Sequence, residues 1–171
     1  EQNAAHAASG MARMTGKPGV CAVTSGPGAT NVITGIATAF ADSIPLVCIT
    51  GQVNSALLGS DVFQEADITG AVESFVKYSY LIKDVNEIPR VFKEAFYIAN
   101  TGRKGPVLID IPKDVQVGKF DYEPQPVVAK AELPKVEDSL IDEAVKLINE
   151  AKRPYIYIGG GAAGLGMGED V

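Results

Sequence analysis

Tryptophan is absent from the 171-residue sequence, and histidine and cysteine are scarce, with one and two residues respectively. The single histidine, His6, lies in an alanine-rich stretch with no candidate partner nearby, so neither a Ser–His–Asp triad nor a zinc site is supported. Both cysteines, Cys21 and Cys48, lie inside apolar runs that resemble strands. We therefore expect buried thiols rather than a disulfide, metal ligands or nucleophiles.

A basic excess is also missing, because 21 acidic residues outnumber 15 basic ones and give a net charge of −6. This balance argues against nucleic-acid binding. No apolar run approaches the roughly 20 residues that span a bilayer, and the sequence opens without the features of a signal peptide. We expect a cytoplasmic protein. Because the sequence lacks an initiator methionine and ends just after a glycine-rich turn, we also expect a piece of a longer chain.

Hydrophobic residues make up 46% of the sequence, enough for a real core. Apolar runs that fit buried strands alternate with stretches of helical spacing, which is typical of a parallel sheet covered on both faces. The sequence therefore predicts an α/β fold with a doubly wound parallel sheet. The expected strands are 20–24, 45–50, 77–82 and 107–111, and the expected helices are 2–15, 32–41, 66–75 and 87–100.

The composition changes after the last of these strands. Residues 119–135 contain three prolines and no helical or strand period, so they are predicted to form a linker between domains. Residues 1–118 would be the first domain, and residues 136–171 the beginning of a second α/β domain. In this second part we expect an amphipathic helix at 137–151 and a strand at 154–158.

The most informative local pattern is a glycine turn between a strand and a helix. Gly26 and Gly28 let the backbone bend and let another group come close, and Pro27 fixes one dihedral angle between them. Ligands gather at the carboxyl ends of strands in open α/β sheets, so this turn predicts a surface that faces a ligand. An ordinary βα turn explains the pattern equally well, because the third glycine of a dinucleotide fingerprint is missing.

Other polar residues allow a structural interpretation as well as a functional one. Glu65 and Asp67 could form an acid–base pair, but a helix cap or a solvated pair is the commoner arrangement. Arg103 could simply complement a helix dipole, and Lys113 could be a solvated lysine at the rim of the sheet. The glycines at 159–161 could admit a cofactor phosphate or form a plain turn after the expected strand.

Taken together and in order, six segments resemble the catalytic large subunits of acetohydroxyacid synthase, also called acetolactate synthase, a family of thiamine diphosphate enzymes. The resemblance runs over nearly the whole chain. The Gly-Pro-Gly stretch is common to many thiamine diphosphate enzymes, whereas Phe-Gln-Glu and Pro-Lys-Asp-Val narrow the likeness to this family. The six segments are residues 1–8, 24–31, 44–47, 50–53, 61–65 and 105–115.

The resemblance implies a role for residues around the glycine turn. Glu1 corresponds to the glutamate that hydrogen-bonds the aminopyrimidine ring of the cofactor and activates it, and it is the first expected catalytic residue. A carboxyl group in a dry cleft beside a ring nitrogen has its pKa set by that partner, which suits such a role. Pro27, Gly28 and Asn31 would line the pocket for the pyrimidine ring.

The resemblance also implies a substrate channel and a flavin site. Gln64, the second expected catalytic residue, would hydrogen-bond a 2-keto acid, and Phe63 and Lys113 would border the channel. Arg103 corresponds to an arginine that contacts FAD. The glycines Gly159, Gly160 and Gly161 correspond to the turn that opens the family's central FAD-binding domain.

The implied reaction condenses two pyruvates, or pyruvate and 2-ketobutyrate, with loss of carbon dioxide, in branched-chain amino-acid biosynthesis. Magnesium would be held outside this segment, and the first strand of the sheet would precede residue 1. We expect these 171 residues alone to be inactive, and the full chain to form a homodimer or homotetramer, with a possible regulatory small subunit. Two alternatives stay open: another thiamine diphosphate-dependent decarboxylase or carboligase, and a non-catalytic α/β binding module.

Overall fold

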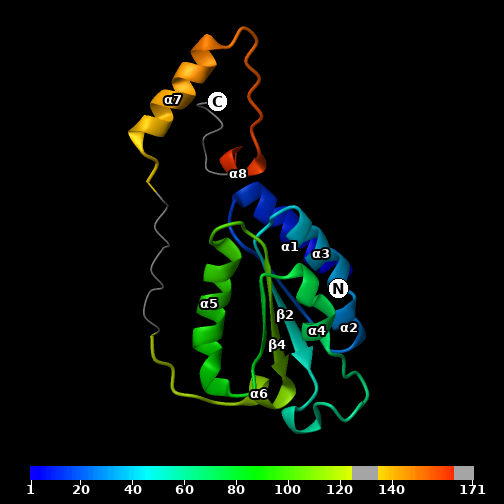
Figure 1. The fold of residues 1–171 in the computed structure, drawn as a ribbon. Helices are drawn as coiled ribbons and strands as arrows, with labels where there is room; N and C mark the ends of the chain where they lie inside the picture. Colours follow the sequence, from blue (N-terminus) through cyan, green and yellow to red (C-terminus); the bar gives the residue numbers. More distant parts are fainter. Residues whose placement is uncertain (125–134, 164–171) are drawn as a thin grey trace. The chain divides into compact units, whose positions relative to one another are not determined.

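The structure, a computed structural model, describes residues 1–124 and 135–163. The chain divides into two compact units, Glu1–Ala129 and Lys130–Val171 (Figure 1). The predicted division into a domain at 1–118, a linker at 119–135 and a second domain from 136 stays a prediction. Among the described residues, no helix combines the length and the apolar character needed to cross a membrane.

Unit 1 is built on a four-stranded sheet of β1 (Gly19–Val23), β2 (Leu46–Gln52), β3 (Tyr78–Leu81) and β4 (Pro106–Pro112). The strand order is β1-β2-β4-β3, and all three pairings are parallel. Every residue of β4 is buried, which explains why its sequence is apolar at almost every position instead of alternating. The parallel pairing brings the carboxyl ends of β1, β2 and β4 to one edge of the sheet.

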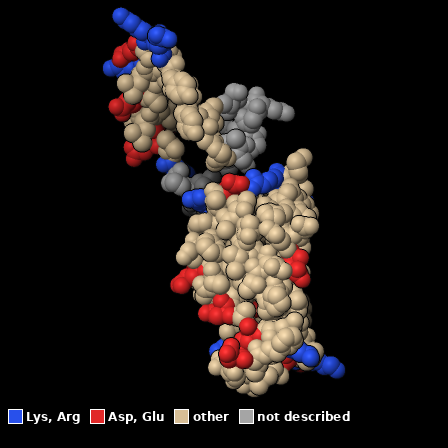
Figure 2. Space-filling view, turned by 90° about the vertical axis from the view of Figure 1, so that its right-hand side faces the viewer, with Lys and Arg blue, Asp and Glu red and all other residues tan. Residues whose placement is uncertain are grey.

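One face of the sheet is covered by α1 (Gln2–Thr15), α3 (Ile33–Ala41) and α4 (Ile68–Val72) (Figure 1). The contact between α1 and α3 depends on small residues, because a Cβ atom added to Gly35 would lie 2.5 Å from the Cβ atom of Ala5. The outer surface of this layer carries few charged side chains (Figure 2), since Arg13 is the only Lys, Arg, Asp or Glu in the two long helices. The two helices therefore pack at close range.

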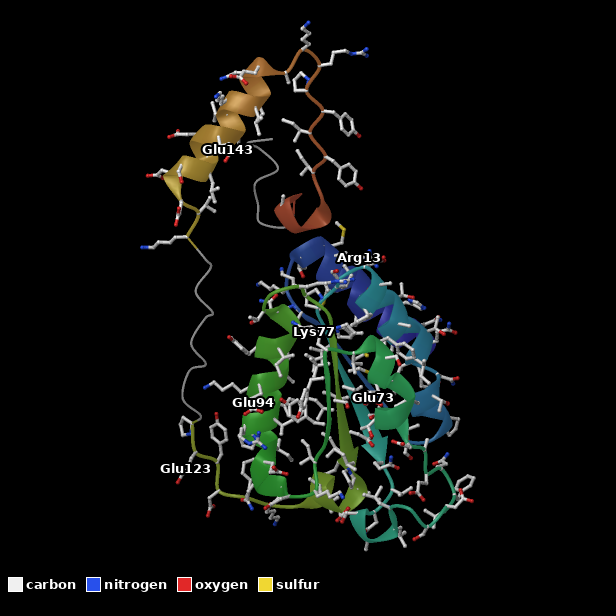
Figure 3. All side chains as sticks on the ribbon, in the orientation of Figure 1. Arg13, Glu73, Lys77, Glu94, Glu123 and Glu143 are labelled. Carbon is white, nitrogen blue, oxygen red and sulfur yellow. The ribbon has the colours of Figure 1, made fainter. Side chains whose placement is uncertain are left out.

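The other face is covered by α5 (Ile88–Asn100), whose buried residues Val91, Ala95 and Ala99 follow the helical spacing seen in the sequence. The end of α5 is capped from outside the helix. The ammonium group of Lys77 donates to the carbonyl oxygens of Ile98 and Thr101, and Figure 3 shows Lys77 close to this helix end. Helices on both faces of a parallel sheet confirm the predicted doubly wound α/β fold.

Five short elements of unit 1 differ from the predictions made from the sequence. The expected helix before residue 41 is preceded by a separate short helix, α2 (Pro27–Thr30), because the chain turns again at Asn31 before α3 begins. The expected helix at 66–75 ends as a 3-10 turn, η2 (Glu73–Phe75). The sequence patterns also did not predict α6 (Lys113–Val117), directly after β4, or two 3-10 turns, η1 (Ser55–Leu57) and η3 (Val85–Glu87).

Unit 2 contains α7 (Asp138–Glu150) and the short α8 (Gly160–Ala163). The amphipathic helix predicted at 137–151 is confirmed. The strand predicted at 154–158 is wrong for the described residues: this stretch has no strand pairing, and Tyr155 and Tyr157 are exposed. An apolar run becomes a strand only where another strand takes up its backbone hydrogen bonds, and the described part of unit 2 contains none.

Candidate active site

A hollow of about 530 Å³ lies where β1, β2 and β4 end. The end of each strand contributes one wall: Ser25 lies two residues after β1, Gln52 ends β2, and Lys113 begins α6 directly after β4. The loop between β2 and α4 supplies Phe63, which is 89% exposed, and Gln64. The structure thus brings together Phe63, Gln64 and Lys113, the three residues predicted to border a substrate channel.

Glu1, Gly28 and Asn31 also lie together, beside the turn after β1. The side-chain amide of Asn31 donates to a carboxylate oxygen of Glu1 at 3.3 Å. A Cβ atom added to Gly28 would lie 2.5 Å from Cγ2 of Thr24 and 3.5 Å from Cγ of Glu1, so a larger residue would crowd the space beside the carboxylate. The second carboxylate oxygen of Glu1 accepts no hydrogen bond from the described part of the chain.

The glycine turn connects the two groups of residues. Pro27 is the first residue of α2, and Gly26 before it has φ 61° and ψ −121°, a conformation that L-residues with a side chain avoid. A Cβ atom at Gly26 would lie 2.9 Å from both Cα and the carbonyl oxygen of Gln64. Gly26 is therefore required twice, for its backbone angles and for the close approach of Gln64. That a ligand lies against this turn stays a prediction.

The loop that carries Gln64, the Gln64 loop, comprises residues 59–66. Its end is tied to the sheet by Gln52, whose side-chain amide donates to the carbonyl oxygen of Ala66 at 2.7 Å. The same amide nitrogen donates to Asp110 of β4 at 3.0 Å. Gln52 thus links the buried centre of the sheet to the loop that forms one wall of the hollow.

Asp110 is the one buried acidic side chain in the described residues, with 1% of its surface exposed. Besides Gln52, the hydroxyl group of Thr50 donates to it at 2.7 Å. Burial raises the pKa of the Asp110 carboxyl from 3.8 to about 6, although both hydrogen bonds act to lower it; the negative charge of Asp67 raises it slightly further. In the folded chain, burial therefore favours the protonated carboxyl over the carboxylate.

Asp114 fixes the position of the lysine next to it in sequence. Its carboxylate accepts a hydrogen bond from the backbone N–H of Ser55 at 2.8 Å and another from the Ser55 hydroxyl group. These two hydrogen bonds lower the pKa of the Asp114 carboxyl, which therefore stays ionised. They also hold η1 against α6, whose place at the end of β4 is seen in Figure 1. The backbone of Lys113 is thereby fixed at the edge of the hollow.

Comparisons with known proteins identify the family of this chain. The family model described as thiamine pyrophosphate enzyme, N-terminal TPP binding domain, matches residues 1–71, which include the glycine turn and the Gln64 loop. The chain is 53% identical over 167 residues to acetolactate synthase of Arthrospira platensis, covering 95% of this chain and 29% of that protein. This chain belongs to the acetolactate synthase family.

Two further relatives extend the comparison. Acetolactate synthase isozyme 1 large subunit of Escherichia coli (strain K12) is 52% identical over 162 residues, which cover 94% of this chain and 29% of that protein. The probable acetolactate synthase large subunit of Methanocaldococcus jannaschii is 51% identical over 177 residues, covering all of this chain and 30% of that protein. This chain therefore spans about 29–30% of the length of these relatives.

The expected flavin residues lie away from this hollow or in unit 2. Arg103 lies between α5 and β4, at the amino ends of the strands. Its guanidinium group donates to the Ser43 hydroxyl group at 2.8 Å and to the carbonyl oxygens of Phe40 and Ala41 at the end of α3. This is the dipole-complementing role that the sequence left open, but on α3 and not on α5.

The three glycines of the expected flavin turn belong to unit 2. Gly160 and Gly161 begin α8 instead of following a strand, so the predicted strand–turn arrangement is wrong here. A flavin contact at Arg103 or at Gly159–Gly161 stays a prediction. His6 is exposed, and the described residues contain no group of three or more His, Cys, Asp or Glu side chains that could hold a metal ion.

The sequence did not indicate the structural roles of Glu65 and Asp110 beside the site. Asp67 is a helix cap, as the sequence favoured: its carboxylate accepts a hydrogen bond from the backbone N–H of Gly70 in α4 at 2.9 Å. Glu65 instead accepts hydrogen bonds from backbone N–H groups of its own loop. Asp110 stands out in the sequence as one acidic residue within an apolar strand. Its partners on β2 became visible only with the strand register, which places Thr50 opposite Asp110.

Proposed function

We propose that this chain is part of the catalytic subunit of an acetolactate synthase and binds the aminopyrimidine ring of thiamine diphosphate beside Glu1. The observation that carries the proposal is the group of Glu1, Asn31 and Gly28: a carboxylate with one oxygen held by an amide and the other open, next to a position that must stay small. The relatives that share about half of the sequence carry the name acetolactate synthase.

The residues present fit such a ring. The open oxygen of Glu1 can hydrogen-bond a ring nitrogen, and Asn31 keeps the carboxylate in one orientation. Gly28, and Pro27 at the start of α2, leave room for a flat group to approach the backbone. When bound, the cofactor supplies a carbon nucleophile and accepts the electrons released with carbon dioxide. Glu1 would hold and transfer the proton at the ring nitrogen, as general acid and base.

The hollow supplies groups suited to a 2-keto acid. Lys113 offers a positive charge for a carboxylate, and the side-chain amide of Gln64 offers N–H donors for a carboxylate or keto oxygen. Phe63 would exclude water from the reacting groups. We propose pyruvate as the first substrate and pyruvate or 2-ketobutyrate as the second. The products are 2-acetolactate or 2-aceto-2-hydroxybutyrate together with one carbon dioxide.

Three further expectations belong to this proposal. We expect the rest of the full-length protein to hold the magnesium ion. FAD would contact Arg103 and Gly159–Gly161. The E. coli relative is named a large subunit, which supports a smaller partner subunit as one possible component of the enzyme. We also propose that the full chain forms a homodimer or homotetramer.

The test is a product assay with the full-length protein, pyruvate, thiamine diphosphate, magnesium and FAD. The proposal predicts acetolactate and carbon dioxide in equal amounts, and no product without thiamine diphosphate. Acetaldehyde as the only product would indicate a decarboxylase, a different carboligation product would indicate another carboligase, and no turnover by a folded protein that binds no cofactor would favour a binding module. Each of these three results would contradict the proposal.

A further inference from the structure

The Gln64 loop holds an unusual backbone conformation next to the hollow. Three residues within six positions have positive φ angles: Gly59 at 81°, Asp61 at 56° and Gln64 at 61°. The left-handed region is unfavourable for residues with a side chain, and most of all for one that is neither asparagine nor aspartate. Interactions elsewhere in the loop must therefore hold Gln64 in place.

The side chain of Glu65 provides these interactions. One of its carboxylate oxygens accepts a hydrogen bond from the backbone N–H of Gly59 at 2.5 Å, and the other accepts from the backbone N–H of Val62 at 3.1 Å. The backbone N–H groups of Ser60 and Asp61 also face the carboxylate, and together the four groups lower its pKa. The loop thus folds around the negative charge of Glu65.

The hydrogen bonds of Glu65 also restrict the backbone of Gln64, the residue before it. Gln64 lies between the part of the loop held by Glu65 and the carbonyl oxygen of Ala66, which Gln52 binds. On its other side, the Gln64 backbone packs against Gly26 at a distance that leaves no room for a Cβ atom. Three contacts therefore hold the main chain of Gln64, and the contact made by Glu65 is the one among them that involves a charged group.

We propose that Glu65 is a positioning residue, which orders the Gln64 loop through its carboxylate and so holds the Gln64 side chain toward the substrate. This inference rests on the proposed function for the role of Gln64, whereas the ordering of the loop does not. Glu65 itself does not touch the substrate in this account. Its charge acts only through the backbone of residues 59–62.

Two variants separate this role from a general effect of charge. Glu65→Gln keeps the shape of the side chain, but removes the negative charge and replaces one acceptor oxygen with an N–H donor, which cannot bind a backbone N–H. Asp61→Asn is the matched control, because it removes a negative charge from the same loop. Asparagine also tolerates the left-handed backbone of position 61.

The first measurement is hydrogen exchange of the backbone N–H groups of residues 59–62 in the full-length protein, without substrate. Glu65→Gln is expected to accelerate exchange at Gly59 and Val62 by about tenfold or more, the scale of one charge-assisted hydrogen bond. Asp61→Asn should leave their exchange unchanged. Equal protection in Glu65→Gln and the unaltered protein would overturn the proposal, whatever the activity.

The second measurement tests whether the effect passes through Gln64. In steady-state assays with pyruvate, Glu65→Gln should lower kcat/KM by about tenfold in the unaltered background. In a Gln64→Ala background the same change should lower it by less than about twofold, because the group that Glu65 positions is already gone. Equal losses in both backgrounds would contradict a positioning role and indicate a general loss of structure.

The two measurements fail separately. If the unaltered protein makes no acetolactate, the proposed function is wrong, and hydrogen exchange still decides whether Glu65 orders the loop. If exchange at Gly59 and Val62 accelerates while kcat/KM stays unchanged, the loop is ordered by Glu65 but Gln64 does not need that order, which also overturns the proposal.

Discussion

Asp110 makes the folding stability of this chain depend on pH in a direction that can be predicted from its surroundings. Burial raises the folded-state pKa of its carboxyl from 3.8 to about 6. Because the folded value lies above the unfolded one, the folded chain favours the protonated carboxyl. The contribution of this group to stability is therefore fully present below pH 4 and is lost as the pH rises to about 6.

The size of the effect follows from the same two values. At 1.36 kcal/mol for each pH unit between the folded and unfolded pKa, ionised Asp110 lowers the free energy of unfolding by about 3 kcal/mol above pH 6. The side chain of Asp110→Asn cannot ionise, so its free energy of unfolding does not fall in this way as the pH rises. Its amide oxygen can still accept from Gln52, and its amide N–H can donate to the hydroxyl oxygen of Thr50.

The assay is urea unfolding of both proteins at several pH values. The free energy of unfolding of Asp110→Asn minus that of the unaltered chain should become more positive by about 2–3 kcal/mol between pH 4 and pH 7. Glu73→Gln is the control, because Glu73 is an exposed carboxylate on η2 (Figure 3), and its difference should stay constant. A constant difference for Asp110→Asn as well would refute the reasoning.

Two further predictions concern packing and the thiols. In urea unfolding, Gly35→Ala should lower the free energy of unfolding by about 1–3 kcal/mol, because the added Cβ atom would meet Ala5. Gly10→Ala should instead raise this free energy by up to about 1 kcal/mol, because no atom lies within 4 Å of the added Cβ atom. Destabilisation by both would contradict this account. Cys21 and Cys48, buried with their Sγ atoms 3.5 Å apart, should resist a water-soluble thiol reagent until denaturant is added; fast labelling of the folded chain would argue against their burial.

Several elements could be predicted from local sequence because their signal is local. The apolar spacing of α5 and the continuous apolar run of β4 each contain their own evidence for helix and strand. The glycine turn was predicted to face a ligand, and Gly26 does adopt a backbone that only glycine tolerates well. These features depend on neighbours within a few residues, so no knowledge of the whole fold was needed.

Other features depend on residues far apart in sequence. The apolar run at 154–158 has the composition of a strand, but a strand also needs a partner, and no sequence pattern tells whether that partner is present. The role of Asp110 depends on the register between β2 and β4, which puts Thr50 opposite it. Glu65 could be found only once the loop backbone was known, since its partners are backbone N–H groups.

The most direct test of the central claim is the rate of acetolactate formation by Glu1→Gln in the full-length protein at saturating thiamine diphosphate. The side-chain amide of the variant keeps the size of the carboxyl group, but it cannot transfer the proton assigned to Glu1. We expect kcat to fall by about a hundredfold or more, within the range for loss of a general acid–base group. An unchanged kcat would contradict the assignment of this carboxylate as the group that activates the cofactor.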